Sequence, residues 1–194
     1  RAAHDAGAIV LADCVTSLGG MPVRVDETGI DVAFSCTQKC LSCPPGLAPI
    51  TVSERAMERL RARKGQVRSF YLDLRLLDDY YNKSHRFHHT APISMFYGLH
   101  AALEAVAAEG LEARFERHRA NHLALVEGLE ALGLKMLVAD PARRLWTVHT
   151  VRVPEGVDDA AVRRSLLLEH GIEVAGGLGA FAGKVFRIGL MGTS

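Results

Sequence analysis

Lys39 lies in a stretch, residues 35–46, whose residue types suit covalent chemistry. The apolar, alternating run over residues 30–34 predicts a strand, so Lys39 follows a strand end, where open α/β sheets place their ligands. Pro44, Pro45 and Gly46 predict a stiff, tight return behind it. An amine held in this way can attack a carbonyl carbon and form a Schiff base. Taken alone, however, such a lysine is more often an ordinary exposed loop residue.

A second stretch places a carboxylate at a similar point. Residues 8–12 are almost continuously apolar and Asp13 follows them, which predicts a strand buried on both faces of a parallel sheet with Asp13 at its carboxyl end. A carboxylate there can keep the pyridine nitrogen of pyridoxal phosphate protonated, and the protonated ring is an electron sink. The alternative is that Asp13 serves as a helix cap or a turn residue.

Seven motifs follow one another along nearly the whole chain: residues 13–20, 29–31, 35–46, 69–73, 87–92, 176–179 and 184–190. In this order they resemble the class V aminotransferases that depend on pyridoxal phosphate, in particular the alanine:glyoxylate and serine:pyruvate group. The resemblance implies an α/β fold of the fold-type I transferases. It also implies that residues 1–110 are the last part of a large mixed-sheet domain and that residues 111–194 are a smaller α+β domain. Relative to the family, the chain would be truncated at both ends.

The resemblance implies a role for each residue around the cofactor. Lys39 would hold pyridoxal phosphate covalently and act as the general acid and base, and Asp13 would pair with the ring nitrogen. Val15 would pack against the ring face, and Gln38 would hydrogen-bond the phosphate. Thr90 matches a threonine that contacts the cofactor of the neighbouring subunit, which implies a homodimer.

Two further positions bear on binding. Phe87 stands where the family usually has a tyrosine, which removes one hydroxyl donor to the phosphate. Arg187 lies within an apolar strand pattern, and a buried arginine without a partner is very costly. We therefore expect Arg187 to meet a carboxylate, either from a protein Asp or Glu or from the substrate, and the resemblance implies the substrate.

The implied reaction is transamination between a small amino acid, alanine or serine, and a 2-oxo acid, glyoxylate or pyruvate. One alternative keeps the fold and changes the reaction, as in phosphonate aminotransferases or cysteine desulfurases. Those desulfurases use a loop cysteine well after the lysine, whereas no cysteine follows Cys43. The other alternative is a catalytically silent fragment or interaction module.

Composition is that of a globular protein without nucleic-acid or membrane partners. The 194 residues are 48% hydrophobic and 23% charged, with a net charge of +1 and no apolar run near the ~20 residues of a membrane helix. We expect a cytoplasmic protein, or a peroxisomal or mitochondrial one in a eukaryote. Because a strand begins only eight residues after Arg1, we also expect a fragment. It would be inactive alone, since the family's phosphate-binding cup lies upstream.

Two clusters invite a metal, and neither predicts one. Cys36, Cys40 and Cys43 have the C-x3-C-x2-C spacing of radical S-adenosylmethionine enzymes, but the aromatic residue usual before the last cysteine is replaced by Ser42. His85, His88 and His89 have no Asp, Glu or Cys nearby to complete a ligand set. We therefore predict reduced thiols and no metal site.

The remaining elements follow from periodicity and caps. Helices are predicted over residues 54–60, 73–81, 94–109, 111–132 and 158–170, and strands over 47–52, 147–153, 172–174 and 185–190. Within the fourth helix we expect His122 to be a half-buried packing residue. The run at residues 176–179 has no helix pattern after it, so a dinucleotide loop is not predicted.

Overall fold

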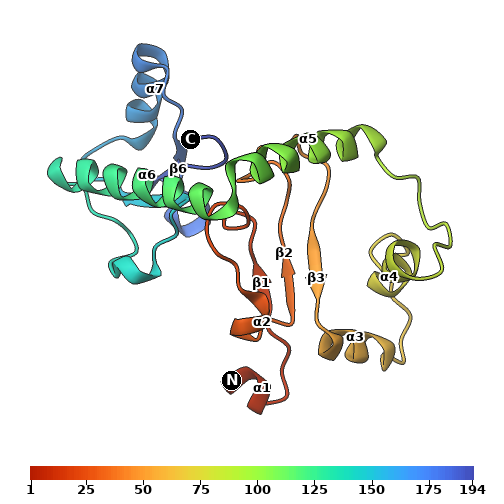
Figure 1. Ribbon diagram of the computed structural model, residues 1–194. Helices are drawn as coiled ribbons and strands as arrows, with labels where there is room; N and C mark the ends of the chain where they lie inside the picture. The colour runs from red at the N-terminus through yellow and green to blue at the C-terminus, as the bar shows by residue number, and fades with distance from the viewer.

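The computed structural model describes residues 1–194 and contains two separate three-stranded sheets (Figure 1). The first sheet has three short strands in the order β1-β2-β3: β1 (Leu11–Asp13), β2 (Val32–Phe34) and β3 (Ile50–Val52). β1 and β2 are parallel, and β3 runs antiparallel to β2. Pro49 directly precedes β3, which is tolerated because one side of an edge strand needs no backbone partner. The strand predicted over residues 47–52 is therefore confirmed in a shorter form.

β1 is an edge strand and not an inner one. Its only neighbour is β2, and Leu11 is 63% exposed, so the prediction that residues 8–13 are buried on both faces is wrong for this chain. Its alignment is held by the buried carboxylate of Asp31, which accepts hydrogen bonds from Val10 N at 2.8 Å and from Ser53 Oγ at 3.2 Å. The bond from the Val10 N–H is the largest cause of the lowered pKa of Asp31.

Four short helices accompany the first sheet: α1 (Ala2–Asp5), α2 (Val25–Thr28), α3 (Glu54–Arg61) and α4 (Leu74–Asn82). The helices predicted over residues 54–60 and 73–81 are thus confirmed. α3 begins at Ser53, whose hydroxyl accepts a hydrogen bond from Ala56 N at 3.2 Å. α4 begins at Asp73, whose carboxylate accepts one from Arg75 N at 3.0 Å. Each cap satisfies a backbone N–H that has no partner within its own helix.

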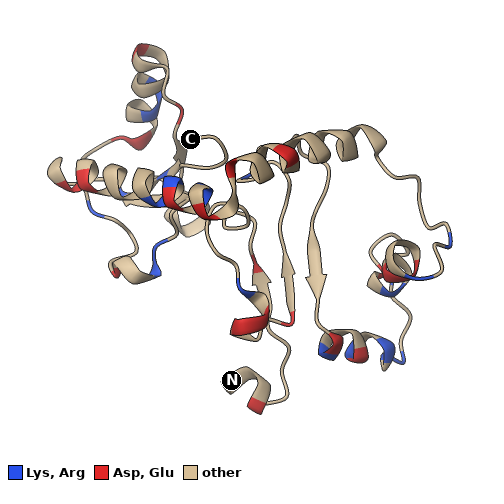
Figure 2. Ribbon diagram, viewed as in Figure 1, with Lys and Arg blue, Asp and Glu red and all other residues tan.

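Two long helices connect the sheets: α5 (Ile93–Glu109) and α6 (Leu111–Ala131). They confirm the helices predicted over residues 94–109 and 111–132. The break falls at Gly110, whose φ of 82° is readily adopted only by glycine. α5 passes over the end of the first sheet and α6 continues toward the second (Figure 1). Charged residues are few on α5 and frequent on α6 (Figure 2). The domain boundary at residues 110/111 stays a prediction.

The second sheet is antiparallel, in the order β4-β6-β5: β4 (Val148–Arg152), β5 (Ala175–Gly176) and β6 (Val185–Gly189). α7 (Asp159–His170) lies between β4 and β5 in the chain, and two 3₁₀ turns complete the region, η1 (Pro141–Arg143) and η2 (Gly179–Phe181). The strands predicted over residues 147–153 and 185–190 and the helix over 158–170 are confirmed. None of the helices combines the length and the apolar character needed to cross a bilayer.

The strand predicted over residues 172–174 is wrong. Gly171 has a φ of 66° and ends α7 with a left-handed turn, after which Ile172 N donates to Leu166 O at 2.9 Å. These residues therefore close the helix and are not free to join the sheet. Pairing with β6 starts only at Ala175.

The main apolar core lies between α6 and the second sheet. It consists of Val126, Met136, Val151 and Phe186, and Val151 is fully buried. Val151 and Phe186 are register partners on β4 and β6, so one face of these strands packs against α6. The second sheet therefore has a closed core, whereas the first leaves an edge open.

Candidate active site

The carboxyl ends of β1 and β2 lie side by side. Asp13 ends β1 and Phe34 ends β2, and the two are register partners in the parallel pair. The two segments that follow these strands stay hydrogen-bonded to each other, because Cys14 N donates to Phe34 O at 2.8 Å and Ser35 Oγ donates to Cys14 O at 3.0 Å. The segments that carry Asp13 and Lys39 thus leave the sheet at one place, as the sequence predicts.

The stretch over residues 35–46, here called the lysine loop, is fixed from within. Thr37 is fully buried, and its hydroxyl donates to Pro44 O at 2.8 Å while its backbone N–H donates to Leu47 O at 3.2 Å. Ser42 N donates to Lys39 O at 3.0 Å, which closes a turn at the lysine itself. These bonds tie the two ends of the loop to one another, in keeping with the tight return predicted from the prolines.

The Lys39 amine is available for chemistry. Its side chain is half-buried, and none of the hydrogen bonds or ion pairs of the chain engages it. A half-buried amine without a carboxylate partner suits a reaction with an aldehyde, because no ion pair has to be broken first. Lys64 and Lys83 are exposed by comparison.

The Asp13 carboxylate is oriented by its own turn. Its Oδ1 accepts a hydrogen bond from Val15 N at 2.9 Å, and Oδ2 has no partner in the chain. Asp13 is exposed and Val15 is half-buried on the same turn. Asp13 is therefore a turn residue, which was the alternative prediction for it. It also presents one free carboxylate oxygen beyond the strand end.

The two predicted phosphate ligands have different surroundings. Gln38 is exposed and lines a groove of about 890 Å³ together with Cys36 and His89. Thr90 lies between α4 and α5 with an exposed side chain, and its hydroxyl makes no hydrogen bond within the chain. Phe87, three residues earlier, is 71% exposed. No hydrogen bond joins the Thr90 segment to the lysine loop.

Arg187 lies near the middle of β6 and is half-buried. Its Nε donates to Gly176 O at 2.8 Å, and its two terminal nitrogens have no partner. No Asp or Glu of this chain forms an ion pair with it, so the predicted carboxylate partner of Arg187 is not found within residues 1–194. The bond to Gly176 fixes the plane of the guanidinium and leaves its two-pronged edge free.

Cys40 and His88 belong to the packing. Cys40 is fully buried, its thiol donates to Thr16 O at 3.3 Å, and burial raises its pKa. His88 is buried against Phe70, with ring centroids 4.3 Å apart, and its Nε2 lies 3.0 Å from Phe70 O. These side chains are therefore occupied by internal contacts.

Two buried groups were missed or underestimated from the sequence. His122 is only 6% exposed, where half-burial was predicted, and its Nδ1 lies 2.6 Å from Nε2 of the buried His149. Burial lowers the pKa of both rings, that of His149 to about 4. Arg114, 3% exposed, was not singled out at all. Its spacing of four residues from His118, and of eight from His122, places it on the buried face of α6 and could have revealed it.

Comparison with known proteins gives one family. The family model described as aminotransferase class-V matches residues 1–190. The chain is 41% identical to (S)-ureidoglycine–glyoxylate transaminase of Bacillus subtilis, over all of this chain and 51% of that protein. It is also 41% identical to alanine–glyoxylate aminotransferase of Callithrix jacchus, over 97% of this chain and 46% of that protein.

Solved structures agree with the sequence relatives. An alanine–glyoxylate aminotransferase from Nostoc sp. superposes with a TM-score of 0.92 at 49% identity, covering 98% of this chain and 50% of that one. A pyridoxamine–pyruvate aminotransferase from Mesorhizobium loti gives a TM-score of 0.88 at 33% identity, with 98% and 48% covered. The chain thus has the predicted fold-type I architecture and spans about half the length of the relatives it matches. It belongs to the class V aminotransferase family.

Proposed function

We propose that the protein is a pyridoxal-phosphate-dependent aminotransferase that moves an amino group between alanine or serine and glyoxylate or pyruvate. The observation that carries the proposal is that the unpaired amine of Lys39 and the free carboxylate oxygen of Asp13 are carried by segments that leave the ends of two adjacent parallel strands. The names of the relatives support glyoxylate as the amino acceptor.

The donor set fits the cofactor. Lys39 offers a primary amine for its aldehyde, Asp13 a carboxylate for its ring nitrogen, and Gln38 and Thr90 neutral hydrogen-bond donors for its phosphate. Val15, on the turn that orients Asp13, offers an apolar surface for the ring. Once bound, pyridoxal phosphate supplies an electron sink for the pair of electrons left when the substrate Cα loses its proton.

Lys39 is assigned the proton transfer. Ser42 N donates to Lys39 O and so holds the backbone from which the long side chain would bring Nζ to the substrate Cα. Nζ takes the proton from Cα as a general base and later returns one as a general acid. Its lack of an ion-pair partner leaves its lone pair available after deprotonation.

Asp13 and Arg187 are assigned to charged groups of the cofactor and of the substrate. The free Oδ2 of Asp13 holds a proton on the ring nitrogen, while Oδ1 stays bonded to Val15 N and keeps the carboxylate in place. Arg187 grips the substrate carboxylate with its two terminal nitrogens, the geometry that suits guanidinium, while Nε remains on Gly176 O. The same arginine then receives the 2-oxo acid product.

A homodimer completes the proposal. Thr90 would donate to the cofactor phosphate of the neighbouring subunit, and Phe87 would leave that phosphate one donor short. The apolar surface of α5 supports an interface, since Ile93 is 63% exposed and Tyr97 is 74% exposed. α5 also carries few charges (Figure 2).

The test is a donor and acceptor panel on the natural protein that contains this chain. Alanine, serine, cysteine and (S)-ureidoglycine are each paired with glyoxylate and with pyruvate, and both products are measured. We expect alanine with glyoxylate to react, and (S)-ureidoglycine is included because a 41% identical relative is named for it. Sulfide release from cysteine without amino transfer would favour a desulfurase. Absence of any cofactor absorbance would favour a catalytically silent protein.

A further inference from the structure

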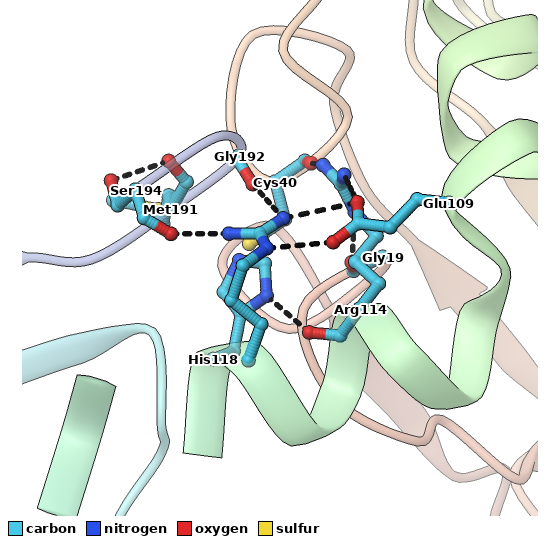
Figure 3. A network of polar contacts seen from close by, with 9 residues as sticks. Gly19, Cys40, Glu109, Arg114, His118, Met191, Gly192 and Ser194 are labelled. Atoms are coloured by element: carbon cyan, nitrogen blue, oxygen red, sulfur yellow. Dashed lines mark hydrogen bonds and ion pairs between the residues drawn. The ribbon is translucent and has the colours of Figure 1, made fainter. Parts of the chain in front are cut away.

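One buried arginine connects the two segments that carry the proposed catalytic groups. Arg114, on α6, donates from Nε to Gly19 O at 2.9 Å and from Nη2 to Cys40 O. Gly19 belongs to the turn that follows Asp13, and Cys40 directly follows Lys39. The side chain is only 3% exposed, and its third nitrogen, Nη1, is bonded to Glu109 (Figure 3).

Glu109 ties this arginine to a second one. Its carboxylate accepts from Arg117 Nε at 2.6 Å and from Arg117 Nη2 at 3.0 Å, as well as from Arg114. Arg117 in turn donates to Gly192 O at 3.0 Å, and its Nη1 is bonded to Ser194 O. The bonds from Arg117, followed by those from Arg114, hold the pKa of Glu109 at about 2. The three charged groups thus form one unit, here called the Arg114 clamp: Glu109, Arg114 and Arg117.

The base of the lysine loop, which the Arg114 clamp holds, is tightly packed. A Cβ at Gly20 would lie 2.4 Å from Thr147 Cγ2 and 2.8 Å from Cys40 Sγ, and a Cβ at Gly192 would lie 2.1 Å from Ser42 Oγ. Cys40 is fully buried in this layer. The carbonyl that follows Lys39 is therefore fixed by packing and by a charged donor at once.

We propose that Arg114 is a positioning residue for Lys39, a proposal that rests on the proposed function of that lysine. Arg114 forms no hydrogen bond with the Lys39 amine, and its side-chain hydrogen bonds go to two loop carbonyls and one carboxylate. A charged donor gives these carbonyls stronger bonds than a neutral group would, and a buried guanidinium has to be fully paired to be tolerated. By bonding Gly19 and Cys40 together, it sets where Lys39 stands relative to Asp13.

The experiment compares Arg114→Met and Arg114→Lys with a matched control in the natural protein. Arg119→Met is the control, because Arg119 lies on the same helix in an exposed ion pair with Glu116. The first readout is the rate at which pyridoxal phosphate becomes attached to apoprotein at Lys39, trapped with borohydride and located by peptide mapping. The second is kcat and KM for alanine, and the third is thermal unfolding.

We expect Arg114→Met to slow trapping at Lys39 and to lower kcat on the order of 10- to 100-fold, because a displacement near 1 Å costs that much. KM for alanine should stay within about twofold, since Arg187 is untouched. Arg114→Lys should recover part of the rate, because an ammonium can still reach one carbonyl. Arg119→Met should behave as the unmodified protein.

The inference is overturned if Arg114→Met is folded by circular dichroism and traps the cofactor at Lys39 at an unchanged rate. If Arg114→Met does not fold, Arg114→Lys decides: an unchanged trapping rate and kcat in that variant would equally overturn the inference. Failure of the proposed function would look different. In that case the unmodified protein itself would carry the label elsewhere than on Lys39, or carry none.

Discussion

The region beyond the ends of β1 and β2 differs from the buried layer behind the lysine loop. The difference is whether the polar side chains have hydrogen-bond partners within the chain. In the first, the Lys39 amine and the Asp13 Oδ2 atom have no partner in the chain, and both side chains are at least partly exposed. In the second, Arg114 and Thr147 are buried and bonded to carbonyl oxygens. The polar groups of the first region are free to bond a ligand, whereas those of the second are already hydrogen-bonded within the chain.

The difference shows which region bears the free-energy cost of holding the site in place. Burying a polar group without a partner is expensive, so the layer behind the loop must satisfy nearly every donor. Only Nε2 of His118 lacks one there. Because this layer holds the backbone, the reactive side chains in front can stay unpaired without losing their positions. The predictions below separate the two regions, beginning with the largest effect.

Lys39→Ala should lower kcat for alanine and glyoxylate by at least about 10³-fold, because both the covalent anchor and the proton-transfer group are lost. The measurement is steady-state transamination together with borohydride trapping. Lys64→Ala is the control, since Lys64 is exposed and outside the site. Label found on Lys64 or Lys83 in the unmodified protein would contradict the assignment.

Asp13→Asn should lower kcat roughly 100-fold with little change in KM, because the lost carboxylate acts on charge that develops during the reaction. An asparagine still accepts from Val15 N, so the turn is kept. Parallel measurement of kcat and KM for alanine distinguishes this from a role in positioning. A raised KM with unchanged kcat would show that Asp13 only shapes the turn.

Arg187→Lys should weaken kcat/KM for amino acids and 2-oxo acids alike by about 1–3 kcal/mol, since lysine keeps the charge and loses the two-pronged contact. Arg164→Lys is a suitable control, because Arg164 lies on α7 with an exposed side chain and pairs with no Asp or Glu of the chain. Unchanged KM values for donor and acceptor would remove Arg187 from the site.

The buried histidine pair predicts the dependence of stability on pH. Burial lowers the pKa of His149 from 6.5 to about 4, so the unfolded chain binds a proton there more readily than the folded protein. Stability is therefore complete above pH 6.5 and is lost as the pH falls toward 4. Between pH 6.5 and pH 5 the loss from this group should be on the order of 1 to 2 kcal/mol.

Urea unfolding of the natural protein at both pH values measures this loss. In His149→Gln the difference between the two pH values should shrink, because the amide can bond His122 without titrating. His170→Gln, at the exposed end of α7, should leave the difference unchanged. An equal pH dependence in all three proteins would exclude the pair as its source.

Sequence reasoning succeeded where the signal is local. The start of the helix predicted over residues 54–60, and the strand ends at Asp13 and Phe34, depend on neighbours within a few residues, and the structure confirms them. It failed at residues 172–174 because the helix-ending motif of α7 competes with the sheet for the same backbone. That competition is invisible to a pattern of alternating residues.

The buried layer was missed for a different reason. Arg114 reaches Cys40 across 74 residues, and Thr147 donates to Thr16 across 131. No periodicity within a single helix or strand encodes such partners. The roles predicted for Val15, Gln38 and Thr90 came from the family resemblance and stay predictions, because each depends on a cofactor or a second subunit.

The glycine at position 192 has a consequence for how the protein is made. Gly192 packs against Ser42 and accepts a bond from Arg117, so the base of the lysine loop is complete only when this residue is in place. A ribosome adding about 5–20 residues per second reaches Gly192 roughly 8 to 30 s after Lys39. During that interval the nascent loop lacks its support. We therefore expect the lysine loop to become fully ordered only after residue 192 has been made.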